Sequence, residues 1–254
     1  MSNSKELVSW EEKMKELATQ QASQETTGSN YISLKGGMMT YMDQPMPNNE
    51  MEVVVLGATG EHSYYDEAYD PDRTIPPKCF AVFDLDDEPT SHDDVPADQK
   101  QDDNEGCKTC WAHQFKSAEN GRGRACSVRR RLAVMMAADL SDPTSADVAM
   151  LKLPPTSVGN WSKYVNKLSA QYQRPFFMVT TRIFVTPHPK FQYTVGFETK
   201  QLVEGESFET LLAMHEGVTP LLMAPLNMTE SEEEEEPAPL KSTRKKAKKK
   251  AVKK

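Results

Sequence analysis

The chain has 254 residues, of which 37% are hydrophobic and 27% charged, and its mean hydropathy is -0.66. This length and composition predict one large folded domain with polar extensions, and they exclude a chain that is mainly disordered or membrane-embedded. No apolar run reaches eighteen residues and the N-terminus lacks a secretory pattern. We therefore expect a cytoplasmic protein with no membrane partner.

The formal net charge of -8 is distributed unevenly along the chain. Residues 241–254 contain nine lysines and arginines and no acids, which leaves residues 1–240 at -17. A run of glutamates at 232–236 lies just before this basic block. Neither block contains enough apolar surface to order itself, so residues 229–254 are expected to form a disordered tail, acidic and then basic.

The first half of the chain predicts an N-terminal helix followed by short strands. Apolar residues at three- and four-residue spacings predict an amphipathic helix over residues 4–20, which could support self-association. Strands are expected within 31–42, 51–60 and 79–84, and the acidic residues of 84–105 predict a long solvated loop. Glycines at 57 and 60 predict a hairpin turn, because no third glycine and no helix follow as a nucleotide-binding loop would require.

The second half continues the strand pattern with two helices. Strands are expected within 130–139 and 147–154, a helix over 156–172, a hairpin made from 175–185 and 191–198, and a helix over 207–217. Together these elements predict a mainly β fold, an OB-like small barrel with an inserted zinc loop. The expected organisation is a helix and linker at 1–28, the barrel at 29–228 and the tail at 229–254. The aromatic residues expected in the barrel core are Tyr31, Tyr41, Trp161, Tyr164, Phe191 and Tyr193.

All four cysteines lie within forty-eight residues, and two of them form a C-x2-C pair. Two thiolates at that spacing can chelate one zinc ion, and zinc takes four such ligands tetrahedrally without an open catalytic position. The predicted ligands of a structural zinc are Cys79, Cys107, Cys110 and Cys126. Alternatives are a histidine, His113 or His92, in place of one cysteine, or four reduced cysteines that are simply buried. Glycines 106, 121 and 123 beside the ligands predict turns with unusual backbone angles.

Basic and aromatic residues are interleaved with the last three cysteines. Cations that follow a phosphate backbone, together with aromatic faces that stack bases, are what single-strand binding requires. The opposing interpretation is that the arginines neutralise the acidic loop at 84–105. Because the arginine run enters a strand, Arg129 and Arg131 should share one face and Arg130 the other. The candidate nucleic-acid contacts are Lys108, Trp111, Lys116, Arg122, Arg124, Arg129, Arg130 and Arg131.

The order of these features resembles a family of single-stranded DNA-binding proteins from tailed bacteriophages. The matching features are Pro77-Lys78-Cys79 at a strand start, the C-x2-C pair, the turn from Gly121 to Cys126, the strand from Arg130 to Val134, and Leu151-Lys152-Leu153-Pro154-Pro155. The resemblance implies an OB-like barrel with a zinc loop that binds single-stranded DNA during phage replication, recombination and repair. It also implies that replication or recombination proteins could bind the tail.

Two other classes of protein share some of these features. A zinc-ribbon-like adaptor or transcription-modulating protein would use the same loop to contact a protein, and a virion structural protein would use the metal only to stabilise a β domain. No phosphate-binding loop, nucleophile elbow or zinc-protease motif is present in the sequence, so we expect no enzymatic activity.

Overall fold

The computed structural model describes residue 13 and residues 30–67, 75–101, 106–119 and 121–226. Apart from Lys13, the helix expected over 4–20 lies outside this part of the chain, and so does the tail expected at 229–254.

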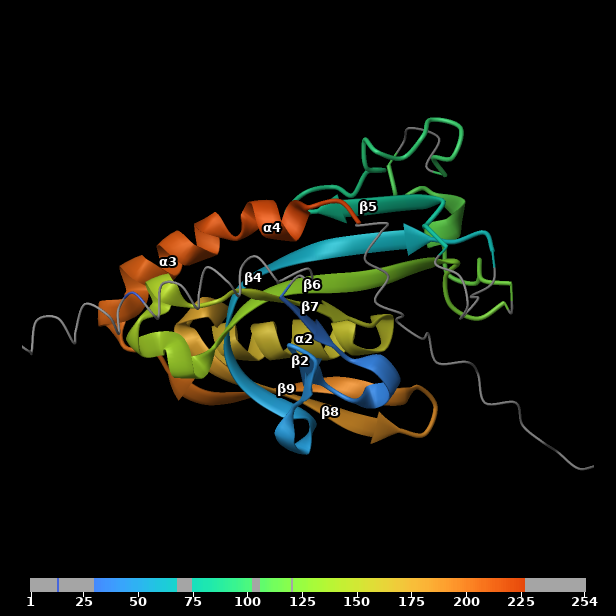
Figure 1. Cartoon of the computed structure of the whole chain (residues 1–254). Coiled ribbons are helices and arrows are strands. Elements are labelled where there is room, and N and C mark those ends of the chain that lie inside the picture. The colour runs from blue at the N-terminus through green and yellow to red at the C-terminus, as the bar shows by residue number, and fades with distance from the viewer. Residues whose placement is uncertain (1–12, 14–29, 68–74, 102–105, 120, 227–254) are drawn as a thin grey trace, which may run out of the picture.

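Nine strands form one strongly curled sheet, in the order β3-β2-β1-β7-β6-β4-β8-β9, with β5 beside β4 (Figure 1). The prediction of a mainly β domain with a few helices is confirmed. The strands are β1 (Tyr31–Ser33), β2 (Thr40–Tyr41), β3 (Gln44–Pro45), β4 (Glu50–Tyr64), β5 (Cys79–Phe83), β6 (Cys126–Met136), β7 (Ala149–Leu153), β8 (Val179–His188) and β9 (Gln192–Leu202). Within the described part of residues 30–226, the α-helices are α2 (Pro155–Lys167), α3 (Phe208–Gly217) and α4 (Thr219–Met223), and a π-helical turn at Leu168–Tyr172 extends α2.

Strand β4 is the longest strand and gives the sheet its curl. It pairs with β6 along most of its length, but on its other side it pairs first with β8, over Glu50–Val54, and then with β5, over Gly60–Tyr64. The register with β6 shifts between Val55 and Gly57, which marks a bulge. Because a bulge bends a strand and increases its twist, β4 can belong to the curled body at one end and to a separate extension at the other.

The predicted hairpin turn at Gly57 and Gly60 is wrong, because both glycines lie inside β4. They are needed for close packing rather than for chain reversal. A Cβ atom on Gly57 would lie 2.7 Å from Leu222 of α4, and one on Gly60 would lie 2.2 Å from the ring of Phe83. A sequence pattern cannot distinguish these two uses of glycine, since both leave a gap in the strand pattern.

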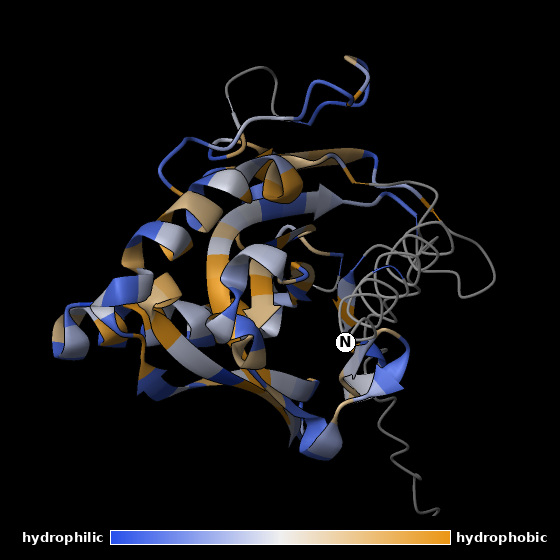
Figure 2. Ribbon diagram, turned by 60° about the vertical axis from the view of Figure 1, so that its left-hand side comes forward, coloured by the Kyte–Doolittle hydropathy of each residue, from blue (hydrophilic) through white to orange (hydrophobic). Residues whose placement is uncertain are grey.

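Two hydrophobic cores cover the two faces of the curled sheet. Helix α2 lies inside the curl, where Trp161, Tyr164 and Leu168 pack against residues of β4, β6, β7 and β8. Helices α3 and α4 cover the opposite face, where Leu211 and Leu222 pack against β4 and β6. Figure 2 shows the hydrophobic stretches of the curved strands facing the helices. The expected core positions of Trp161 and Tyr164 are confirmed.

Helix α2 also covers the open edge of β9. The backbone N–H of Val195 donates to Ser157 Oγ at 2.8 Å, and Asn160 Nδ2 donates to the carbonyl of Val195 at 2.9 Å. Tyr193 of β9 also packs against Gly37, in the segment that follows β1. A Cβ atom added to Gly37 would lie 3.3 Å from the Tyr193 ring. Side-chain contacts therefore hold β9 near the segment that follows β1.

The expected core position of Phe191 is wrong. Phe191 lies at the tip of the β8–β9 hairpin, where it is 43% exposed and stacks on His188 with ring centroids 4.7 Å apart. The alternating pattern of β9 extends to Phe191, but the sheet against which it would pack ends before the hairpin tip.

Candidate metal centre and cationic surface

The ends of β4, β5 and β6 extend beyond the curled body and carry two of the four cysteines. Tyr64 of β4 is directly opposite Cys79, the first residue of β5, and Cys126, the first residue of β6. Residues directly opposite one another share a face of the sheet, so both cysteines lie on the same side. They are separated by two strand spacings, or about 9.6 Å between backbones.

The chain between β5 and β6 folds over this face and brings the other two cysteines to it. The backbone N–H of Cys107 donates to the carbonyl of Pro89 at 2.8 Å, and Ser117 Oγ accepts from the backbone N–H of Ala125 at 2.9 Å. The prediction of unusual turns is confirmed, because Gly106, Gly121 and Gly123 have φ values of 87°, 65° and 83°. The loop is held in place by these turns and hydrogen bonds.

The result is one small cavity that the thiols of all four cysteines help to line. Each cysteine is buried, and none forms a disulfide. Two imidazoles and the hydroxyl of Ser91 line the same cavity. The lining side chains with donor atoms suited to zinc are Cys79, Cys107, Cys110, Cys126, His62 and His113.

Within this set, His62, His113 and Cys126 are grouped most closely. One ligand atom from each lies within 4.8 Å of the other two, so the group could hold a metal ion. His62 is opposite Val128, two residues from Cys126, and the two side chains are therefore diagonal neighbours on adjacent strands. The rings of His62 and His113 stack with centroids 4.6 Å apart. His62 is not predicted by any sequence motif, and only the register of β4 with β6 reveals it.

The protonation chemistry of these groups suits a bound cation. Burial, with smaller contributions from the neighbouring Cys107, Cys110 and Cys79, raises the pKa of Cys126 to about 12. A thiolate here requires a nearby positive charge, such as a zinc ion that displaces the thiol proton. Burial lowers the pKa of His62 to about 3, with contributions from His113, Arg130 and Arg124. His62 is therefore neutral and keeps a lone pair for a metal.

Hydrogen bonding distinguishes the two histidines. The Nδ1 atoms of both are buried and have no hydrogen-bond partner, as expected of atoms that face a ligand. However, Arg124 lies with a guanidinium nitrogen 3.3 Å from His113 Nε2. A guanidinium can only donate, so this contact places the His113 proton on Nδ1, where it would block a metal. His62 is subject to no such restriction from a contact that the structure describes.

The alternative ligand His92 is not among the residues that line the cavity. Its ring stacks on Phe80 at 4.9 Å, and its Nδ1 accepts the backbone N–H of Asp94 at 3.2 Å. The other alternative, His113, does lie at the cavity.

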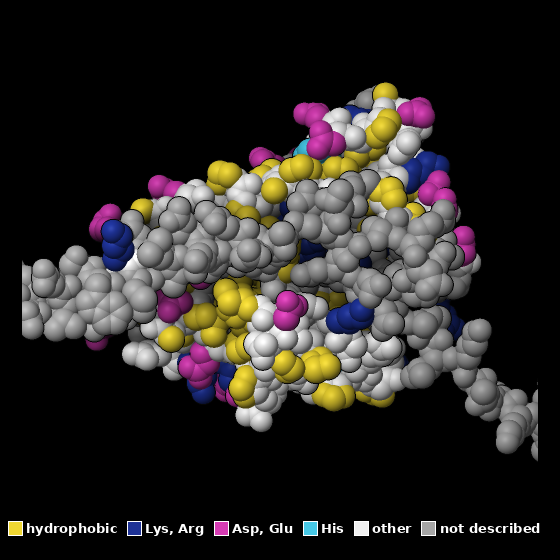
Figure 3. Space-filling view, in the orientation of Figure 1, with side chains coloured by type: hydrophobic (Ala, Val, Ile, Leu, Met, Phe, Trp, Pro, Cys, Tyr) yellow, Lys and Arg dark blue, Asp and Glu magenta, His cyan; other side chains and the backbone are white. Residues whose placement is uncertain are grey.

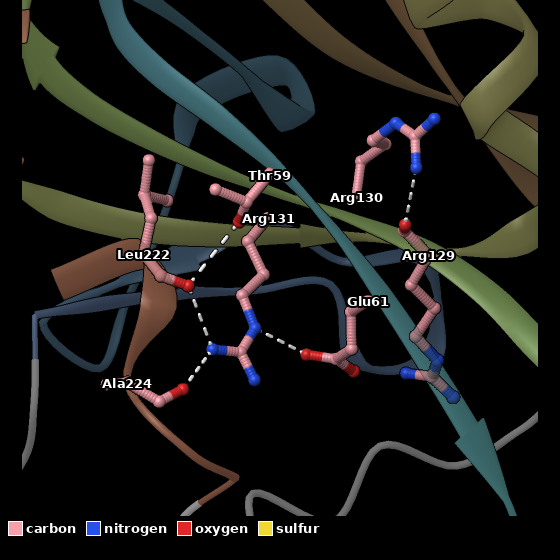
Figure 4. Close-up of polar contacts among 7 residues, drawn as sticks. All are labelled: Thr59, Glu61, Arg129, Arg130, Arg131, Leu222 and Ala224. Carbon is pink, nitrogen blue, oxygen red and sulfur yellow. Dashed lines mark hydrogen bonds and ion pairs between the residues drawn. The ribbon is translucent and has the colours of Figure 1, made fainter. Parts of the chain in front are cut away.

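The three consecutive arginines of β6 point to both faces of the sheet, as the alternation of a strand requires. Figure 4 shows Arg129 and Arg131 on one side and Arg130 on the other. Arg131 is buried: its Nε donates to Glu61 at 2.6 Å and its NH1 donates to the backbone carbonyls of Leu222, at 3.0 Å, and Ala224. Only 2% of the Arg131 side chain is exposed, so it cannot be the DNA contact predicted from the sequence.

The other candidate contacts remain accessible. Lys116, Arg122 and Arg124 are exposed, Arg129 and Arg130 are half-buried, and exposed Lys108 forms an ion pair with Glu88. Trp111 is 49% exposed, and its ring meets the edge of Tyr64. The loop also carries Phe115, which is 70% exposed.

Acidic side chains gather close to these cations. Figure 3 shows them over the loop that follows β5, at the upper right of the molecule. Within this loop, Val95 is buried against Phe80 and Val82, while most of the described acids are exposed. The ion pair between Lys108 and Glu88 shows that some neutralisation occurs, although Arg122 and Arg124 remain exposed.

Comparison of the chain with protein-family models, with curated proteins and with solved structures gives no match. Among the described residues, no helix combines the length and the apolar composition needed to cross a membrane.

Proposed function

We propose that this protein is a non-enzymatic single-stranded DNA-binding protein built on an OB-like barrel with a structural zinc. The strand pairings support the barrel. β4 pairs with β6 and β8, β6 pairs with β7, β8 pairs with β9, and α2 lies between β7 and β8 in the chain. These pairings fit a five-stranded, partly open barrel of the OB type, in which β7 and β9 would be the third and fifth strands and do not pair with each other.

The position of the inserted loop carries the functional proposal. In OB barrels, oligonucleotides bind across the second and third strands and against the loops that join strands one to two and four to five. Here the connection between the first and second barrel strands is the segment that contains β5, three of the cysteines and the exposed cations, and the fourth cysteine, Cys126, begins the second barrel strand. A metal-fixed loop at this position would present Arg122, Arg124, Lys116 and Trp111 to a strand with little ordering cost.

The metal proposed at this site is one zinc ion held by Cys79, Cys107, Cys110 and Cys126. The C-x2-C pair favours these ligands, because two of the thiolates come from one short turn. The competing set is Cys126 with His62 and His113, which the structure groups more tightly but in which Arg124 directs the His113 proton toward the metal side. The four-cysteine set would leave no open coordination position on the zinc, so the metal would supply rigidity rather than chemistry.

The cellular role proposed for the protein follows from the family resemblance. It would protect single strands during phage DNA replication, recombination and repair in the host cytoplasm, and its tail could bind replication or recombination proteins. The exposed aromatic Phe115 would also suit the competing class, an adaptor that binds a protein through this loop.

The direct test is titration of the full chain with oligo(dT) at two salt concentrations, with intrinsic tryptophan fluorescence, to which the exposed Trp111 contributes, as the signal. We expect quenching and an affinity that falls as salt rises, because each neutralised phosphate releases counterions. The double variant Arg122→Ala/Arg124→Ala should bind more weakly and lower the salt slope by about 1.4. Its matched control is Lys163→Ala/Lys167→Ala, which removes the same charge from the exposed side of α2.

An unaltered chain that binds no oligonucleotide at low salt would overturn the proposal and leave the adaptor class as the better account. Zinc content separates the two ligand sets: Cys107→Ser should lose zinc and His62→Ala should keep it if the four cysteines bind. The opposite result would assign the zinc to the histidine set.

A further inference from the structure

The face of β4, β5 and β6 that carries the cavity also carries one half-buried arginine. Arg130 of β6 is directly opposite Gly60 of β4, and Gly60 is directly opposite Phe83 of β5. The three residues therefore form one row across the sheet, on one face. His62 lies two residues after Gly60 on the same strand and so faces the same way. Arg130 and His62 are therefore diagonal neighbours on adjacent strands.

A second arginine reaches the same imidazole from the loop. The ring of His62 meets Phe83 edge to face, with centroids 4.8 Å apart, and stacks on His113 at 4.6 Å. Arg124 Nη1 lies 3.3 Å from His113 Nε2. Because a guanidinium can only donate, His113 accepts this hydrogen bond and holds the side chain of Arg124. A continuous series of contacts thus runs from Phe83 through both imidazoles to Arg124.

No described carboxylate neutralises these two guanidiniums. The ion pairs of the described residues include neither Arg124 nor Arg130. Arg130 Nη1 donates only to a neutral acceptor, the carbonyl of Arg129, at 3.3 Å. Burial lowers the pKa of Arg130, so its charge is partly removed from water. A partly desolvated cation without a counterion attracts anions more strongly than a fully hydrated one.

The imidazoles between the two arginines add no positive charge. Burial lowers the pKa of both His62 and His113, and the charge of Arg124 lowers both further. The pair is therefore neutral at pH 7, and a neutral pair of rings flanked by two guanidiniums suits an anion with several acceptor oxygens. Planar guanidiniums bind phosphate in this way, with two parallel N–H groups directed at its oxygens.

We infer that Arg124 and Arg130 bind one backbone phosphate of single-stranded DNA beside the His62–His113 pair, and that His113 is a positioning residue that orients Arg124. This inference rests on the proposed function and deepens it. The sequence presents the basic residues of this region as equivalent contacts, whereas the fold brings these two, one from the loop and one from β6, to the same pair of rings.

The first test is a double-mutant cycle of Arg124→Ala and Arg130→Ala in the full chain, measured as the salt dependence of oligo(dT) affinity. Each single variant should bind several-fold more weakly. The double variant should lower the salt slope by about 0.7, the value for one phosphate contact on a single strand. A decrease of about 1.4 would indicate two separate phosphates and overturn the shared subsite. Arg130→Lys keeps the charge and should keep the slope.

The second test addresses the positioning role of His113. His113→Phe keeps a ring that can stack on His62 but removes the acceptor for Arg124. We expect oligo(dT) binding to weaken several-fold in the otherwise unaltered chain and to weaken no further in the Arg124→Ala background, because the arginine that His113 orients is then absent. Further weakening in that background would show that His113 acts through the metal or the fold, and would overturn the positioning role.

The outcomes separate this inference from the proposed function. If Arg124→Ala and Arg130→Ala bind oligo(dT) as tightly as the Lys163→Ala/Lys167→Ala control, the subsite is overturned and the proposed function stands. Absence of binding by the unaltered chain overturns both. If Arg130→Ala lowers the melting temperature enough to unfold the protein, Arg130→Gln takes its place in the cycle, because it removes the charge and keeps most of the side-chain stem.

Discussion

The two ends of the β4–β6 pair differ in what stabilises them. At the end inside the curled body, Val53–Leu56 are completely buried, and hydrophobic cores cover both faces of the sheet. At the far end, the buried residues of β4 are Glu61, His62 and Ser63, and the hydrophobic clusters around the cysteines are small. Burial of apolar surface suffices to order the first end. At the second end, the buried charges, imidazoles and thiols need ion-pair, hydrogen-bond or metal partners. The comparison therefore predicts that substitutions at the two ends have separable effects.

The largest effect is expected at the far end, from removal of the metal. Cys126→Ala removes a ligand present in both candidate sets, and structural zinc contributes on the order of 10 kcal/mol to folding of small zinc domains. We expect loss of zinc by elemental analysis and rapid hydrogen exchange in β5 and the loop, while α2 and β8 stay protected. The control is His92→Ala, which should retain the metal. About one zinc per chain in Cys126→Ala would contradict both ligand sets.

Removal of Trp161 should have the largest effect at the other end. Its side chain is 3% exposed and contacts Tyr164, Phe176 and Phe197, so Trp161→Ala leaves a large cavity inside the curl. Substitutions of this kind cost about 3–5 kcal/mol. Denaturant unfolding should show that loss while the zinc content is unchanged. A variant that lost zinc in its folded state would show that the two ends are coupled.

Breaking the buried ion pair of Arg131 and Glu61 should lower the free energy of unfolding slightly less than removing Trp161 does. Arg131→Met leaves Glu61 buried without its closest positive charge and removes the donor to Leu222 and Ala224, at a cost of about 3 kcal/mol. The double variant Arg131→Met/Glu61→Leu removes both charges and should recover part of that stability. Thermal unfolding of the two variants measures the difference. Equal stability of the single and double variants would show that the charge on Glu61 is not the source of the loss.

The smallest effect is expected where α2 covers the edge of β9. Ser157→Ala leaves the buried N–H of Val195 without an acceptor, which costs about 1–2 kcal/mol. The matched control is Ser162→Ala on the exposed side of the same helix, where Ser162 Oγ bonds only to the carbonyl of Val158. Chemical denaturation should distinguish the two variants. If the free energy of unfolding falls by the same amount in both variants, the loss reflects only the change of serine to alanine within a helix, and the hydrogen bond to β9 contributes no stability.

Much of the local structure was predictable because it depends on short-range patterns. The β-branched and aromatic runs at β8 and β9, the proline at the start of α2 and the glycines of the loop each indicate an element through backbone preference. The grouping of the cysteines also follows from their spacing, because Cys107 and Cys110 must lie within one turn of each other.

Other predictions failed where packing rather than local preference decides. Gly57 and Gly60 were interpreted as a turn, but they make room for Leu222 and Phe83, which are distant in the chain. Arg131 was grouped with its neighbours as a surface cation, but the arrival of α4 buries it beside Glu61.

The sequence by itself determined a mainly β domain, the position of α2 between strands, and a cysteine-rich loop whose glycines adopt positive φ. These features depend on residues close together in the chain, whose preferences act before the fold is complete. Only the tertiary structure decided that His62 joins Cys126, that Arg131 is buried and Arg122 exposed, and that Arg130 is a diagonal neighbour of His62. Each of these depends on strand register or on a helix packed from elsewhere, and a shift of one residue in register would turn every side chain of the strand to the opposite face.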